Sequence, residues 1–391
     1  MKKTARTLSR TLSRSLLALA AASAVGAGCT PPPAPPKPPP VPTAVATTPP
    51  PQAPTVPDDS TPPASGPARE LALPAAKWEQ LANGLPFATI ATSALPIVQI
   101  RVVALAGSAA DGDKPGLASI TGELLKDGGA GSLSSRDLLA RVESLGATLD
   151  IATSFDRTTL SIAVTRDQFA EALELLATVA LKPTMKESEF TKLKKRGIDE
   201  AADRARTDGG WAASMMLYKG LFGRTATPHP YAAYDATATE LGNIALSDCR
   251  AFHKKLFLPK NMFVVVAGDV TADEVKTAVE KDFGAASGGE PVASVVPAVT
   301  APDHLTITLV DRPKSTQSDV LAGVLGPERA SPSWPAFSAA NQILGGGVAG
   351  RLFADVREKQ SLAYRTSSSL TELAHGPSLL VAYAGTQSAK T

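Results

Sequence analysis

Apolar and polar residues follow strand-like or helix-like periods along most of the chain after residue 85. Between residues 96 and 106, for example, Val98, Ile100 and Val102 fall on one face, which predicts a strand. Strands are predicted at 85–91, 96–106, 148–151, 159–164, 264–268, 319–324 and 362–368, and helices at 116–125, 134–145, 168–180, 187–206, 272–283, 334–344 and from 351 onward. Because helices alternate with hairpins, we expect an α+β fold whose sheets are largely antiparallel and covered by helices.

An internal repeat underlies this order of elements. Residues 138–164 run as helix, turn, strand, turn and strand, and residues 352–383 run in the same order, offset by about 215 positions. We therefore expect two copies of one fold, at 75–285 and 303–391, with a linker rich in small residues at 286–302. The second copy stops where the first continues for roughly 120 residues. This predicts an incomplete second domain, from a fragment or a shortened reading frame, and an exposed apolar face on a sheet spanning residues 305–383.

The N-terminus combines a basic segment with a short apolar run. Residues 2–14 carry five Lys or Arg and no acid, and the apolar run from Leu16 to Ala27 is too short to span a bilayer. Small residues directly before Cys29 resemble a bacterial lipobox, so residues 1–29 are interpreted as a lipoprotein signal peptide with a lipidated Cys29. The Thr that follows favours the outer membrane, with the protein facing the periplasm. A cleaved signal peptide with an incidental Cys29, or a short membrane anchor, remain alternatives.

Residues 30–74 are interpreted as a spacer. Seventeen of the chain's 33 prolines lie between residues 31 and 67, where no periodic apolar face is present. Such a segment cannot form a core and favours an extended polyproline conformation. A proline-rich ligand for a recognition module is the alternative.

Charge and cysteine content exclude several classes of protein. The formal net charge is +2, and no basic stripe is interleaved with aromatic residues, so nucleic acid is not an expected partner. Two cysteines, of which Cys29 is assigned to lipidation, make no disulfide framework. Cys249 is expected to be a small core residue of a helix. The sequence has no G-x-S-x-G elbow and no P-loop, and Asp111 with Asp113 is interpreted as part of a turn.

The most informative stretch begins at Gly345-Gly346-Gly347 and continues through Arg351 to Tyr364. Gly345, Gly347 and Gly350 match G-x-G-x-x-G, but a predicted helix rather than a strand precedes them, which argues against nucleotide binding. A glycine turn with a surface Arg and a half-buried Tyr is the simplest interpretation. The segment also resembles the glycine-rich loop and Arg/Tyr pair of the insulinase/pitrilysin family of zinc peptidases, of the mitochondrial processing peptidase type.

This resemblance locates the zinc motif of the family and shows that it is degenerate. The family's H-x-x-E-H helix follows an entry similar to Lys114-Pro115-Gly116-Leu117-Ala118. The two His positions then hold Ser119 and Glu123, the Glu position holds Gly122, and Glu200 corresponds to the third ligand. The four histidines, at 229, 253, 304 and 375, have no ligand spacing. We therefore expect no metal or other cofactor in this chain, and zinc only in a partner.

The resemblance implies a role without zinc. In two-chain members of the family one subunit carries H-x-x-E-H and the other the Arg/Tyr pair, and this chain is similar to the second. Arg351 would then hold a substrate carbonyl and Tyr364 would donate to the oxyanion, while Gly345, Gly346 and Gly347 let an extended peptide approach. The alternative is a peptide-binding or scaffold lipoprotein of the envelope. An independently active peptidase is the third and least favoured hypothesis.

Overall fold

The computed structural model describes residues 66, 73–225, 227–290 and 296–391. The predicted signal peptide, the lipidation site Cys29 and nearly all of the proline-rich spacer lie outside the described residues. Residues 71–391 form one compact unit. No helix in the described ranges combines the length and the apolar character needed to cross a membrane. The boundaries at 285 and 303 stay predictions.

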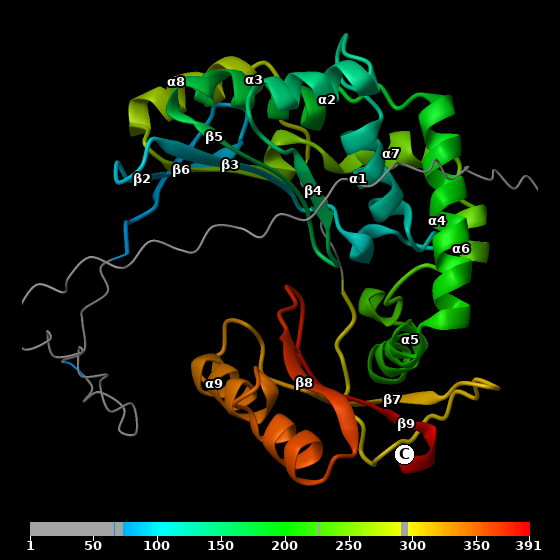
Figure 1. Cartoon of the computed structure of the whole chain (residues 1–391). Helices are drawn as coiled ribbons and strands as arrows, with labels where there is room; N and C mark the ends of the chain where they lie inside the picture. Colours follow the sequence, from blue (N-terminus) through cyan, green and yellow to red (C-terminus); the bar gives the residue numbers. More distant parts are fainter. Residues whose placement is uncertain (1–65, 67–72, 226, 291–295) are drawn as a thin grey trace, which may run out of the picture. The chain divides into compact units, whose positions relative to one another are not determined.

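The first sheet has six strands in the order β1-β2-β6-β3-β5-β4 (Figure 1). Their bounds are β1 Lys77–Gln80, β2 Pro86–Ala91, β6 Met262–Gly268, β3 Ile97–Ala104, β5 Thr158–Thr165 and β4 Asp150–Thr153. Only β2 and β6 run parallel, and every other neighbouring pair is antiparallel. The central strand β3 pairs Ile100 with Ile162 of β5 on one side and with Val266 of β6 on the other. The predicted mostly antiparallel α+β fold is therefore confirmed.

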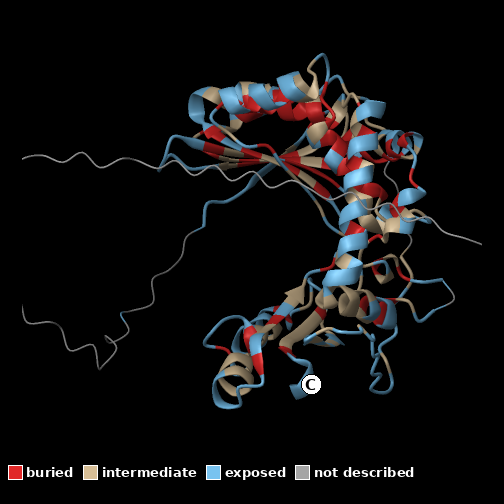
Figure 2. Cartoon of the chain, turned by 45° about the vertical axis from the view of Figure 1, so that its right-hand side comes forward, coloured by how far each residue is buried: buried red, intermediate tan, exposed pale blue. Residues whose placement is uncertain are grey.

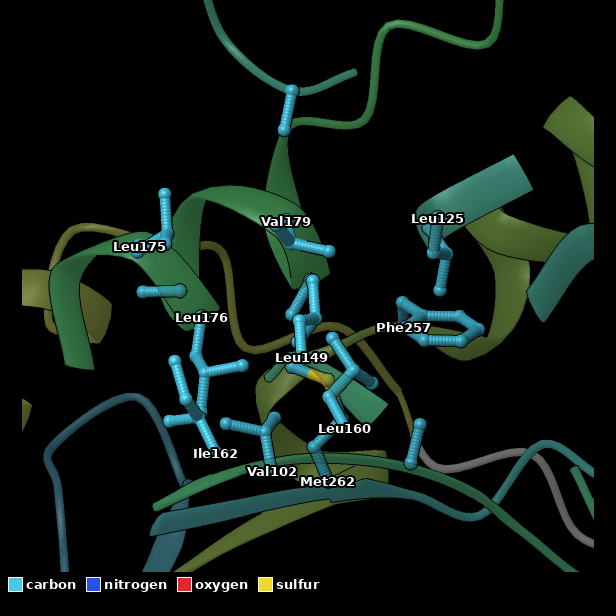
Figure 3. Close-up of a cluster of buried hydrophobic side chains, with 14 of the residues drawn as sticks. Val102, Leu125, Leu149, Leu160, Ile162, Leu175, Leu176, Val179, Phe257 and Met262 are labelled. Atoms are coloured by element: carbon cyan, nitrogen blue, oxygen red, sulfur yellow. The ribbon is translucent and has the colours of Figure 1, made fainter. Parts of the chain in front are cut away.

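Helices cover this sheet and extend from it. Its helices are α1 Leu117–Asp127, α2 Ser135–Ser144, α3 Phe169–Leu181, α4 Glu187–Thr207, α5 Gly209–Phe222, α6 Ala238–Gly242, α7 Leu246–Leu256 and α8 Ala272–Phe283. In Figure 3, Leu176 and Val179 of α3 point toward Val102, Leu160 and Ile162 on the strands. Residues along β6 alternate between buried and half-exposed, and Figure 2 shows red positions concentrated where helices meet strands. The core therefore forms from one face of the sheet, as the strand period predicts.

The second sheet has three strands in the order β7-β9-β8. Its elements are β7 Gln317–Leu325, α9 Trp334–Gly345, the π-helix η5 Phe353–Lys359, β8 Ala363–Thr371 and β9 Leu379–Gln387. The order β7-β9-β8 matches β3-β5-β4 in the first sheet, and a helix precedes β8 as α2 precedes β4. This shared order is what the sequence repeat predicts. The sheet begins at Gln317, not near residue 305, and the side chains of Leu305, Ile307 and Leu309 are 84–89% exposed.

Helix α5 joins the two sheets, and sequence reasoning did not find it. It begins with Gly209 and Gly210, and its apolar residues do not fall on one face, because it packs on β7 at one side and on η3 (Pro230–Ala232) at the other. A Cβ at Gly209 would lie 2.3 Å from an Asp319 carboxylate oxygen. The pair of glycines therefore permits close approach, at a helix end where a periodic pattern has not yet begun.

Candidate functional site

The helix that carries the degenerate zinc motif is positioned by a buried carboxylate. Asp111 is 7% exposed, and its two carboxylate oxygens accept the backbone N–H groups of Gly116 and Ala118 at 2.8 and 2.7 Å. Gly116 has φ +93°, which glycine adopts without steric cost, and α1 starts at the next residue. Burial raises the pKa of Asp111 to about 7. This role as a buried cap was missed from sequence, where Asp111 was predicted to lie in a simple turn.

The positions that correspond to the zinc ligands do not converge on a metal site. Ser119 is exposed on α1, and Gly122 is buried so closely that a Cβ would lie 2.7 Å from Thr153 Oγ1 of β4. Glu123 points to α4, where it pairs with Arg196 at 2.7 Å between Oε2 and Nη2. Across the described residues, no group of three or more His, Cys, Asp or Glu side chains is arranged to hold a metal ion. One hydroxyl, one glycine and a paired carboxylate do not fit zinc.

One guanidinium lies between carboxylates of the two helices. Arg196 of α4 lies 2.7 Å from Glu123, and 3.8 Å separates it from each of Asp127 and Glu200. Two of the positions compared with zinc ligands, Glu123 and Glu200, therefore share one arginine. The side chains are 39–61% exposed, so these pairs are solvated and individually weak. The guanidinium therefore partly neutralises the three carboxylates, which remain solvated.

Two of the four histidines, His229 and His375, lie beside Tyr231, and the described residues place none of the four in a metal-binding group. His229 is buried, and its Nδ1 accepts the Tyr231 backbone N–H at 3.2 Å. His253 bonds the Ala180 carbonyl, His304 lies beside Asp303, and the backbone N–H of His375 donates to the Tyr231 hydroxyl. Cys249 is buried, which raises its thiol pKa to about 11 and makes it unreactive.

The first two glycines of the triple glycine are closely packed, whereas the third faces open space. A Cβ at Gly345 would lie 2.5 Å from the Ser368 backbone nitrogen of β8, so this glycine lets α9 end against the strand. A Cβ at Gly346 would meet the Gln342 side chain at 2.2 Å, whereas one at Gly347 would have no atom within 4 Å. Only Gly347 therefore leaves free space of the kind that an approaching peptide needs.

Tyr364 occupies a bulge at the start of β8. Ala363 pairs with Thr386 and Arg365 with Gly385, so Tyr364 is the extra residue between them. Its side chain is 84% exposed. The guanidinium carbon of Arg357 lies 5.2 Å from the Tyr364 ring centroid and 4.5 Å from that of Phe353. Arg351 is exposed at the start of the same helical segment. The cation–π contact thus joins Tyr364 to Arg357. The sequence analysis did not select Arg357, although it lies only seven positions before the tyrosine.

A polar cavity of about 690 Å³ lies beside α5. Its walls include Ser119 of α1, Trp211 of α5, Asp319 of β7, Arg365 of β8 and Tyr383 of β9. The Tyr383 hydroxyl donates to Asp319 at 2.6 Å, and burial together with that carboxylate raises the Tyr383 pKa to about 12. The Arg365 guanidinium lies 5.4 Å from the Tyr383 ring. The cavity falls within the range of small-molecule and peptide sites.

Comparisons with known proteins identify the family. Residues 87–218 match the model "Insulinase (Peptidase family M16)", and residues 243–391 match "Peptidase M16 inactive domain". The chain is 27% identical over 250 residues to an uncharacterized zinc protease of Mycobacterium tuberculosis, and over 230 residues to the zinc protease PqqE of Helicobacter pylori. These alignments cover 63% and 58% of this chain and 56% and 51% of those proteins. The chain therefore spans about half the length of the curated relatives it matches.

Solved structures give the same assignment. A peptidase M16 inactive domain from Pseudomonas fluorescens aligns with a TM-score of 0.71 and 27% identity, covering 80% of this chain and 74% of that one. A protease from Helicobacter pylori aligns with a TM-score of 0.73 and 24% identity, covering 81% and 76%, and shows the shared fold. With both consecutive models of one family matched and the zinc positions lacking histidine, the chain is a member of the insulinase family, peptidase family M16, without that family's zinc motif.

Proposed function

We propose that this chain is a non-catalytic subunit that supplies Tyr364 and a neighbouring arginine to the active site of a partner carrying H-x-x-E-H. The observation that supports this most is the state of Tyr364. It projects from a β-bulge, is 84% exposed, and lies under a guanidinium, in a chain whose own zinc positions hold Ser119, Gly122 and Glu123. Bulges commonly redirect side chains at functional sites. A phenol displayed in this way is accessible to a second protein.

The chemistry of the pair suits peptide hydrolysis. A phenolic hydroxyl donates to the oxyanion that develops on the scissile carbonyl. A guanidinium offers two parallel donors to a carbonyl or carboxylate. The sequence points to Arg351 for this second role, and the contact with Tyr364 points to Arg357. Zinc would belong to the partner, and the substrate would be an extended peptide that passes the open side of Gly347.

Co-expression with an H-x-x-E-H sister, followed by cleavage of a fluorogenic peptide library, tests the proposal. Cleavage is expected only when both chains are present. Arg351→Ala and Arg357→Ala, compared in the same assay, identify which guanidinium binds substrate. Tyr383→Phe is the matched control, because it removes a phenol from the cavity and leaves Tyr364 intact. Full activity of the sister alone, or of the pair with Tyr364→Phe, would overturn the proposal.

The cavity beside α5 supports a second candidate, a peptide-binding protein that acts without a catalytic partner. Its lining is polar, and Arg365 together with Asp319 offers both a cation and an anion to a peptide. Trp211 lies in its wall, so binding should change tryptophan fluorescence, and Trp211→Phe should abolish that change. Tyr383→Phe should weaken this binding, whereas Tyr364→Phe should not. The two phenol variants therefore separate the two functions.

For location, we propose the periplasmic side of the bacterial outer membrane, through a lipid on Cys29. The support is the basic segment, the short apolar run and the small residues before Cys29. The full chain should fractionate with membranes and incorporate labelled fatty acid. Cys29→Ala should release it or leave the signal uncleaved, and Cys249→Ala, which removes the buried thiol, should change neither result. Recovery of the unaltered protein from the cytoplasm would contradict the proposal.

A further inference from the structure

The loop that leads to Tyr364 is held by a hydrogen bond from each backbone N–H group of residues 360–362. After the π-helix, the N–H groups of Gln360, Ser361 and Leu362 donate to the carbonyls of residues 355, 357 and 356 at 3.0–3.2 Å. Ser361 has φ +50°, a left-handed conformation that residues other than glycine rarely adopt. The chain therefore turns sharply into β8, and this turn needs support from outside itself.

That support comes from two side chains at the end of β9. The Thr386 hydroxyl, in a residue only 8% exposed, donates to the Leu362 carbonyl at 2.5 Å. The Lys390 ammonium donates to the Ser361 carbonyl at 2.9 Å. These are the two carbonyls immediately before the strand that carries the bulge. Thr386 is also the residue that pairs with Ala363, next to the extra residue Tyr364.

We infer that Thr386 and Lys390 are positioning residues for Tyr364. The Tyr364 ring is mostly exposed and contacts the Arg357 guanidinium. The backbone carbonyl of Arg357 accepts the Ser361 N–H. The direction of the phenol is thus set by the backbone of 361–363. Thr386 holds that backbone from the neighbouring strand β9, and Lys390 holds it from the segment that follows β9. Catalytic groups must be held within a fraction of an ångström, which side chains outside the reacting set accomplish.

The expected effect of Thr386 and Lys390 on catalysis rests on the proposed function, whereas their expected effect on the backbone of residues 360–362 does not. In the full chain without a partner, Thr386→Val and Lys390→Met should increase hydrogen exchange at the amides of 360–362. In NMR spectra of protein with isotope-labelled tyrosine, they should also shift the ring resonances that are assigned to Tyr364. The matched control is Ser388→Ala. It removes the 3.1 Å hydrogen bond from the Ser388 hydroxyl, just after β9, to the Ser315 carbonyl and leaves the bonds of residues 360–362 intact.

In the assembly with an H-x-x-E-H sister, each variant should lower kcat by about tenfold to 10²-fold, as expected when a reacting group is misplaced by up to 1 Å. KM should change little, because the substrate contacts remain. Lys390→Arg, which keeps a donor at the Ser361 carbonyl, should retain most of the wild-type kcat. Unchanged exchange and unchanged Tyr364 resonances in both variants would overturn the inference. Altered resonances in an assembly that shows no Tyr364-dependent cleavage would instead overturn the proposed function and leave the positioning role standing.

Discussion

The helix α1 belongs to the first repeat and the bulged strand β8 to the second, and their polar side chains are treated in opposite ways. On α1, Glu123 is paired to Arg196 across to α4, and Gly122 fits against Thr153 with no room for a side chain. On β8, Tyr364 is exposed, and the bonds around it fix backbone rather than the phenol. One region satisfies its side chains internally, and the other presents one outward. The helix α1 therefore lacks the family's zinc motif, whereas β8 carries an exposed phenol of the kind that the proposed function requires.

The largest expected effect tests the exposed side of that comparison. Tyr364→Phe removes one hydroxyl and keeps the ring under Arg357, so folding should be unaffected. In the assembly with a zinc-bearing sister, loss of one oxyanion donor should lower kcat by about 10²- to 10³-fold. Peptide cleavage measures this, with matched circular dichroism and co-elution as controls for folding and pairing. An unchanged kcat would make Tyr364 an ordinary surface residue.

A matched pair of isoleucines measures how differently the two halves bury apolar side chains. Ile100 on β3 is fully buried, whereas Ile307 is 84% exposed. Ile100→Ala should lower the free energy of unfolding by about 2–5 kcal/mol, through lost burial and the cavity left behind. Ile307→Ala should change it by no more than about 0.5 kcal/mol. Urea unfolding of both variants supplies the values, and a cost of several kcal/mol at Ile307 would mean that this side chain is covered in the intact protein.

The pH dependence of stability tests the buried cap of α1. The pKa of Asp111 is raised to about 7 from its ordinary value of 3.8, mainly by burial. The native state therefore keeps a proton that the unfolded state has released, so this contribution is full below pH 3.8 and is lost as the pH rises through 7. Between pH 5.5 and 8 the wild type should lose about 1–2 kcal/mol more than Asp111→Asn. Asp113 is an exposed neighbour in the same loop, so Asp113→Asn should show the same pH dependence of stability as the wild type. An equal pH dependence in the wild type and in both variants would refute the role of Asp111.

The smallest effect is expected at the arginine that stands between the former ligand positions. Arg196→Gln removes three solvated ion pairs and should cost at most about 1 kcal/mol. Arg206→Gln, on the same helix with one exposed partner, is the control. Neither the purified wild type nor the variant should carry stoichiometric zinc by elemental analysis. About one tightly held zinc per wild-type chain would contradict our interpretation of Ser119, Gly122 and Glu123.

Sequence periodicity predicted several elements that bury one face. The helix predicted at 272–283 is α8, whose apolar stripe is buried. The strand predicted at 319–324 lies within β7, although Val320 and Val324 are 45% and 55% exposed there. Periodicity failed at α5, which packs on two sides and begins with two glycines, and at the start of the second sheet, which was predicted near residue 305 and begins at Gln317. A strand needs a neighbour to complete its hydrogen bonds, and a pattern does not supply one.

For this protein, the sequence by itself determined the family resemblance, the order of the repeated elements and the lack of histidine at the zinc-motif positions, because each depends on which side chains stand at which spacing. Tertiary structure alone decided that Asp111 is a buried cap, that Arg196 links the former ligand positions and that Arg357 rather than Arg351 reaches Tyr364. These contacts depend on burial, on a π-helical turn and on a one-residue bulge. Glu123 and Arg196 lie 73 positions apart, and the bulge at Tyr364 forms only where β8 pairs with β9, so the order of residues along the chain specifies neither feature.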